Sequence, residues 1–99
     1  MTAPSFQQFE ADCRARGFDE VLERPWAANT QVASHSHPFD VSALMVQGEL
    51  WLTVNDQTRH LQAGDTFELS RDVPHQERYG ADGALFWVAR RHAVAATPR

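Results

Sequence analysis

The sequence predicts an all-β fold of one domain with a short helix at its amino terminus, and three observations support this. With 99 residues, the chain can form one core around one pocket, and we expect no second domain. From Phe18 onward, short runs rich in Val, Leu, Phe, Trp and Thr alternate with turn residues at intervals of about ten residues, which is typical of all-β proteins. Only the segment before Phe18 has the spacing of a helix.

The amino-terminal segment has the signals of a short amphipathic helix. Ser5 is suited to cap its start together with Gln8, three residues further on, and Gly17 is a typical stop signal. Its apolar face consists of Phe6, Phe9 and Cys13. We expect this face to pack on the rest of the protein.

After the helix, the alternation of apolar and polar side chains predicts a series of strands. They are expected at residues 18–24, 31–37, 39–46, 49–54, 58–61, 66–69, 75–79 and 84–91. We expect Asn55-Asp56 to turn one hairpin and Gly48 to turn another.

Residues 84–89 differ from the other predicted strands because they have no polar face. Such a strand is covered on both sides, either by the helix or by another subunit. We therefore predict a homodimer that covers Leu85 and Trp87, or their opposite-face neighbours Phe86 and Val88.

Charge and composition argue against several classes of partner. The net charge of −4 gives no field that attracts nucleic acid or an anionic membrane. No apolar run approaches the roughly 20 residues of a membrane-spanning helix. The single cysteine, Cys13, forms no disulfide within the chain, and the start lacks the pattern of a secretory signal, so we expect a cytoplasmic protein.

The stretch His35-Ser36-His37 is the first candidate for chemistry. In an extended chain, residues two apart project on the same side, so two imidazoles can converge on one metal ion. A simple His-x-His pair can equally be solvated or hydrogen-bonded on an edge strand. The rest of the chain has to decide between these two interpretations.

These histidines belong to a longer pattern that resembles the cupin superfamily. That family carries two motifs: a glycine, five residues, His-x-His, three or four residues, a glutamate, six residues and a glycine; then a glycine, five residues, a proline, one residue, a glycine, two residues and a histidine. The first motif is matched by His35, His37 and Gly48, and the second by Gly64-Asp65, Pro74 and His75. The resemblance covers roughly residues 28–88. In this stretch the chain is similar to small single-domain cupins.

The resemblance implies an antiparallel, jelly-roll-like cupin β-barrel. Residues 18–92 are assigned to this barrel, residues 1–17 to the helix packed on it, and residues 93–99 to a flexible tail. It also implies His35, His37 and His75 as ligands of one divalent transition metal ion, with Zn, Fe, Ni and Mn not distinguished.

Several positions depart from the family pattern. Turn positions carry Asn29, Ser70, Asp72 and Tyr79 in place of the family residues. Asn and Asp tolerate left-handed backbone conformations, so the fold is little affected. The glutamate position is occupied by Val41, which cannot bind a metal. The neighbouring Asp40 faces away from the histidines by strand parity, unless a bulge near Pro38 turns it inward.

The remaining candidates each have two readings. Glu77 shares a face with His75 and either accepts a hydrogen bond or a proton near the metal, or pairs with Arg78 or Arg59 on the surface. His60 and His92 are expected at the surface. The aromatic residues either line a pocket or form the core, with the core favoured. They are Trp26, Trp51, Trp87, Phe39, Phe67 and Phe86.

Two functions follow from the resemblance. The first is a cupin that binds a small organic ligand, similar to the effector-binding half of arabinose-type transcription regulators but without their DNA-binding half. The second is a metal-dependent enzyme such as a three-His dioxygenase, similar to the thiol dioxygenases, or an isomerase or hydrolyase. We favour the first, because no acid–base pair beyond Glu77 is evident.

Overall fold

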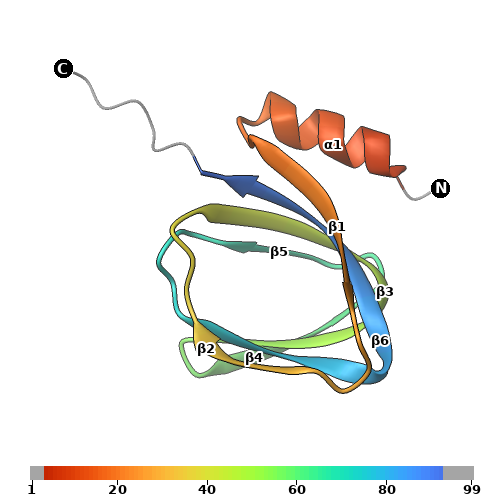
Figure 1. Cartoon of the computed structure of the whole chain (residues 1–99), viewed down its shortest axis with the longest axis vertical. Helices are drawn as coiled ribbons and strands as arrows, with labels where there is room; N and C mark the ends of the chain where they lie inside the picture. The colour runs from red at the N-terminus through yellow and green to blue at the C-terminus, as the bar shows by residue number, and fades with distance from the viewer. Residues whose placement is uncertain (1–3, 93–99) are drawn as a thin grey trace.

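One helix and six strands make up residues 4–92, the range that the computed structural model describes (Figure 1). Their bounds are α1 Phe6–Ala15, β1 Glu20–Trp26, β2 Gln31–His35, β3 Asp40–Val54, β4 Gln57–Gln62, β5 Thr66–Leu69 and β6 His75–Arg91. Every strand pair is antiparallel, so the predicted all-β fold is confirmed. The predicted flexible tail, residues 93–99, lies outside the described residues.

Helix α1 begins and ends as the sequence predicts. The backbone N–H of Gln8 donates to Oγ of Ser5 at 3.1 Å, and the Ser5 N–H donates to Oε1 of Gln8 at 2.9 Å, which is a complete capping box. Gly17 follows the last turn with φ of +93°. The helix is therefore fixed at both ends by local chemistry.

The apolar face of α1 covers one side of β6. The rings of Phe6 and Phe9 lie 5.5 and 5.8 Å from the ring of Trp87, while Cys13 is buried beside Ala89. Figure 1 shows the helix lying over β1 and the end of β6. The sequence predicts that either the helix or another subunit covers this strand, and in the structure the helix covers it.

The two longest strands, β3 and β6, bend together and pair along their whole length. Their register runs from Asp40 opposite Arg91 to Val54 opposite His75, with two shifts on either side of Gly48. Residues 39–46 and 49–54, predicted as separate strands, are one strand, and so are residues 75–79 and 84–91. The prediction that Gly48 turns a hairpin is wrong.

Gly48 lies inside β3 because the two bent strands approach each other closely there. Its φ is +80°, and a Cβ atom at this position would lie 2.1 Å from the carbonyl oxygen of Gly83 on β6. A glycine can therefore mark a bend within a strand as well as a chain reversal.

The hairpin turn predicted at Asn55-Asp56 is confirmed, but Tyr79, which the sequence assigns to a turn position, lies buried inside β6. Asn55 and Asp56 connect β3 to β4 with φ of +52° and +64°, as a tight hairpin turn requires. Asn29 and Asp72, which stand at glycine positions of the cupin motifs, have φ of +59° and +66°. Side chains that tolerate the left-handed region thus preserve these turns.

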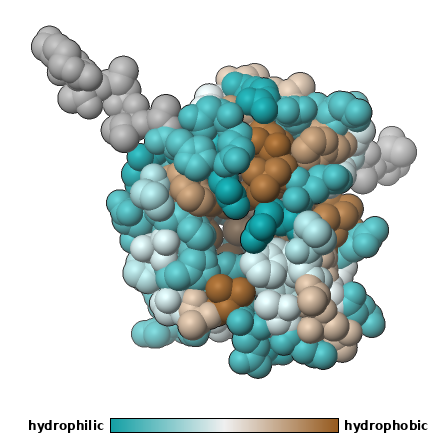
Figure 2. Space-filling model, in the orientation of Figure 1, coloured by the Kyte–Doolittle hydropathy of each residue, from teal (hydrophilic) through white to brown (hydrophobic). Residues whose placement is uncertain are grey.

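The core lies between the bent halves of β3 and β6. Its buried members are Val41, Ala43, Met45, Leu50, Leu52, Leu61, Phe67, Leu69, Tyr79, Phe86 and Val88. On the surface, the face drawn in Figure 2 is mostly hydrophilic, with small apolar patches around a central hollow. Within residues 4–92, no helix has both the length and the apolar character to cross a membrane. The cytoplasmic location stays a prediction.

We predict that Gly48→Ala destabilises the protein more than Gly64→Ala. Both residues have positive φ, but no atom lies within 4 Å of a Cβ built on Gly64. Gly64→Ala is expected to lower the free energy of unfolding by about 1–2 kcal/mol through backbone strain alone. Gly48→Ala adds the clash with β6, about 1–3 kcal/mol more. Urea unfolding measures both, and equal losses would contradict the close approach.

Candidate metal centre

The structure brings the three predicted histidines together. His35 is the last residue of β2, His37 follows in the loop, and His75 is the first residue of β6, paired directly with His35. One nitrogen of each ring lies within 4.8 Å of the others. The predicted strand 31–37 is two residues too long, because β2 ends at His35. His37 reaches the cluster from the loop, where its carbonyl accepts a hydrogen bond from the N–H of Asp72 at 2.7 Å.

Backbone carbonyls orient two of the imidazoles. Nδ1 of His35 lies 2.8 Å from the carbonyl oxygen of Ala33, and Nδ1 of His75 lies 3.0 Å from that of Val73. Because a carbonyl only accepts, Nδ1 carries the hydrogen in the neutral form of each ring, and Nε2 then presents its lone pair. This is the tautomer that a metal ligand needs.

The third imidazole, that of His37, stacks on the ring of Phe39 at 4.7 Å and 7°. Burial lowers the pKa of His37, and the neighbouring His35 and His75 lower it further, which favours the neutral ring. Two nitrogens at about 2.1 Å from a tetrahedral ion lie about 3.4 Å apart, so an ion would draw these nitrogens, which lie within 4.8 Å of one another, closer together. Donor type and tautomer therefore fit a transition metal.

Glu77 adds a carboxylate to this cluster. Its Oε2 lies 3.5 Å from Nε2 of both His35 and His75, and the Tyr79 hydroxyl donates a hydrogen bond to its Oε1. Its side chain is only 11% exposed. Burial raises the pKa of Glu77, but the hydrogen bonds from the protonated form of His75 and from Tyr79 outweigh it and hold that pKa below its ordinary value. The same contact with Glu77 raises the pKa of His75, so a metal ion competes with a proton at Nε2 of this ring. Of the two readings of Glu77, the structure supports the one near the histidines.

Asp40 and Val41 do not contribute ligands. The Asp40 carboxylate accepts the backbone N–H of Arg71 at 2.8 Å and pairs with the Arg71 and Arg91 guanidinium groups at 3.5 and 3.3 Å. It faces away from the histidines, as strand parity predicts. Val41 is buried in the core. The carboxylate of this cluster is therefore on β6 instead of β3.

A cavity of about 90 Å³ lies beside the histidines inside the barrel. It is lined by Arg24, Trp26, His35, His37, Phe39, Val41, Phe67, Leu69, His75, Glu77, Phe86, Val88 and Arg90. Four of the six predicted aromatic residues line it, and Phe67 and Phe86 are core residues as well. Trp87 lies under the helix. The two arginines on this wall were not singled out by the sequence analysis.

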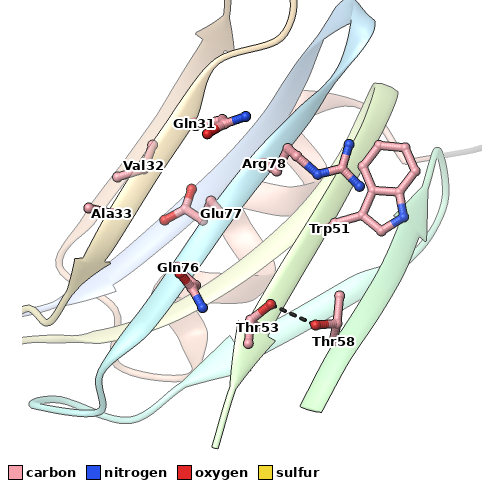
Figure 3. A pocket seen from close by; sticks show the side chains of 9 residues that line it. All are labelled: Gln31, Val32, Ala33, Trp51, Thr53, Thr58, Gln76, Glu77 and Arg78. Atoms are coloured by element: carbon pink, nitrogen blue, oxygen red, sulfur yellow. Dashed lines mark hydrogen bonds between the residues drawn. The ribbon is translucent and has the colours of Figure 1, made fainter. Parts of the chain in front are cut away.

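A larger hollow of about 600 Å³ lies on the other side of the sheet formed by β2, β6, β3 and β4 (Figure 3). Both faces of its Trp51 ring are occupied, one by His60 at 4.4 Å and one by the Arg78 guanidinium at 4.1 Å. Figure 3 shows the Glu77 carboxylate directed toward β2, and Glu77 lines both hollows. His60 and His92 are exposed, as predicted.

Comparison with known proteins agrees with this architecture. A family model described as a cupin domain matches residues 26–89. A stretch of 39 residues is 46% identical to an uncharacterized HTH-type transcriptional regulator of Haemophilus influenzae. That match covers 39% of this chain and 13% of the regulator, so the chain spans a small part of that relative's length.

Solved structures show the same fold. One is a conserved protein with a double-stranded β-helix domain from Klebsiella pneumoniae, with a TM-score of 0.66, 22% identity, and coverage of 81% of this chain and 72% of that one. KdgF from Halomonas sp. has a TM-score of 0.63 and 17% identity, over 74% and 68% of the two chains. At these identities the likeness concerns the fold alone.

Proposed function

The chain belongs to the cupin domain family, and from this premise we propose that it binds one divalent transition metal ion and a small organic ligand. The ion is held by His35, His37 and His75, and the ligand occupies the cavity beside them. The observation that carries the proposal is the convergence of three imidazoles, from β2, the following loop and β6, at one wall of that cavity. A bound ion supplies a Lewis acid at this wall.

The surroundings of the cluster support metal binding over a purely structural role. Imidazole suits Zn, Fe, Ni and Mn, which the cluster does not distinguish. The carbonyls of Ala33 and Val73 hold two rings in the binding tautomer. His75 is nearly fully buried, so its Nε2 is shielded from water beside the other two rings.

A metal-dependent enzyme is the second candidate, and Glu77 is the observation that favours it. Its carboxylate lies 3.5 Å from two of the proposed ligands and lines the same cavity. A carboxylate there is placed to accept a proton from a molecule in the cavity. The enzyme would be a three-His dioxygenase or an isomerase.

Two measurements test these functions. Elemental analysis of protein purified without a metal-affinity tag is expected to find close to one transition metal ion per chain. Oxygen-consumption assays with small thiols and diols after iron reconstitution then separate binding from catalysis. Metal far below one equivalent in every preparation would contradict the proposed site, and oxygen uptake would favour the enzyme.

We predict that His75→Ala weakens metal binding far more than Asp40→Ala. His75 offers a buried nitrogen to the cluster, whereas Asp40 is bound to Arg71 and Arg91. Loss of one of three ligands is expected to lower affinity by at least about 100-fold, judged from the 10–100-fold effect of removing an outer partner. Calorimetric titration with Zn²⁺ measures both variants. Equal losses would show that Asp40 is a ligand.

We also predict that Glu77→Gln lowers metal affinity by about 10–100-fold, because it removes a negative charge beside two ligands. Glu49→Gln is the matched control, since Glu49 pairs with His60 at 3.1 Å on the outer hairpin. The same titration applies to both. Unchanged affinity in Glu77→Gln would show that its carboxylate does not act on the ion.

The homodimer stays a proposal, now centred on Leu85. The helix covers Trp87, while Leu85 on the same face of β6 is only half-buried. Sedimentation at micromolar concentration is expected to give the dimer mass for the native protein and the monomer mass for Leu85→Glu. A monomer mass for the native protein would show that α1 alone covers this strand.

A further inference from the structure

Two arginines point into the barrel at positions where strands normally carry apolar side chains. Arg24 on β1 alternates with Leu22 and Trp26, which pack against the core. Arg90 on β6 alternates with the buried Val88. Both line the cavity that the histidines line. A charged group facing a core is costly unless a partner satisfies it.

The donors of these side chains are not used up within the protein. Among residues 4–92, the Arg24 guanidinium has no carboxylate partner and lies 4.8 Å from the centre of the Trp26 ring. Arg90 contacts Glu20 through Nη1 at 3.4 Å, but its Nε is buried and makes no hydrogen bond. A buried donor without an acceptor destabilises the folded protein. Both cavity-lining side chains therefore have donors without an acceptor in the described part of the chain.

A third donor at this cavity is also unpaired. Trp26 Nε1 and Arg90 Nε are the two buried side-chain polar atoms in the described part of the chain that have no hydrogen-bond partner. Both belong to residues of the same cavity wall. All three available groups are donors, so what is missing is an acceptor.

The charged groups that line the cavity also favour a ligand that accepts hydrogen bonds. The one carboxylate that lines it, Glu77, is already engaged by His35, His75 and Tyr79. The two guanidinium groups and the proposed divalent ion leave an excess of positive charge. An anionic ligand offsets it.

On this basis we propose that the ligand is a small carboxylate with an apolar remainder. Its oxygens accept from Arg24 and from the Trp26 indole N–H, Arg90 adds positive charge to the same cavity, and its apolar part lies against Val41 and Phe67. A carboxylate is planar and matches the guanidinium fork, and about 90 Å³ admits only a few heavy atoms. This inference rests on the proposed function, because it names the ligand of the same cavity.

An alternative role exists for Arg24 alone. β1 pairs only with β6 among the described strands, and an inward charge on an edge strand prevents pairing with other chains. That role predicts more self-association when Arg24 is replaced, with no effect on ligand binding. It accounts for neither the Trp26 nor the Arg90 donor.

The test compares propanoate with propanamide, which has the same shape but no charge, by calorimetric titration of the chain in buffer with and without Zn²⁺. We expect propanoate to bind at least about tenfold more tightly, a difference of about 1.4 kcal/mol. Arg24→Gln is expected to remove this preference and Arg24→Lys to retain part of it. Arg78→Gln is the control, since Arg78 lies on the outer face over Trp51. Inorganic phosphate, which is bulkier and lacks an apolar part, is expected not to compete.

The outcomes separate this inference from the metal proposal, because Zn²⁺ affinity is measured on the same variants. Full Zn²⁺ binding without a preference for propanoate would overturn the carboxylate assignment alone. A propanoate preference without Zn²⁺ binding would uphold the assignment and overturn the metal site. An Arg24→Gln variant that self-associates but keeps the preference would assign Arg24 to edge protection. Competition by phosphate would replace a carboxylate with a phosphate ligand.

Discussion

The antiparallel ladder between β3 and β6 is the interaction on which the rest of this structure depends. β6 also pairs with β1 and β2, so it holds the edge strand, the strand that ends in His35 and the long bent strand at once. At Gly48 the backbones of β3 and β6 come so close that no side chain fits between them. Because both strands bend at this point, one strand contributes to both halves of the barrel.

β6 also carries most of the polar groups inside the barrel. His75, Glu77 and Tyr79 lie on its inner face before the bend, and Phe86, Val88 and Arg90 lie there after it. Tyr79 is 1% exposed and stacks on Trp26 at 4.5 Å, while its hydroxyl is bound to Glu77. Burial and the Glu77 charge raise the pKa of Tyr79 far above its ordinary value, so it acts as a permanent donor. A satisfied network of this kind fixes the position of Glu77 beside the imidazoles.

The sequence predicts those features whose cause is local. The helix cap, the Asn55-Asp56 turn and the left-handed Asn29 and Asp72 each depend on a few neighbouring residues, and all are confirmed. Gly48 was misread because a bend within a strand and a hairpin turn use the same residue type. Only the pairing with β6, more than thirty residues away in sequence, distinguishes the two.

In the candidate site, too, the sequence predicts what depends on neighbouring residues and does not predict what depends on distant strands. The cupin motifs indicate the three histidines before any coordinates, and strand parity correctly turns Asp40 outward. The two-residue spacing on β6 places Glu77 beside His75, as the sequence predicts. Its contact with His35 depends on the irregular pairing of β2 with β6 between Val32 and His35, which no local pattern encodes. The inward arginines were missed because Arg24 and Arg90 look like ordinary surface charges until the sheet's faces are known.

This arrangement gives a physical reason why Val41 can stand where the family motif has a glutamate. With the carboxylate on β6, the proposed ion is held by β2, the following loop and β6, and β3 is free of ligands. Val41 then adds apolar surface to the cavity wall facing the imidazoles. The unpaired donors of Trp26 and Arg90 lie at the same cavity. The same cavity thus combines groups that suit a metal with groups that suit an anion with an apolar body, and a ligand that contacts both also gives the buried donors an acceptor.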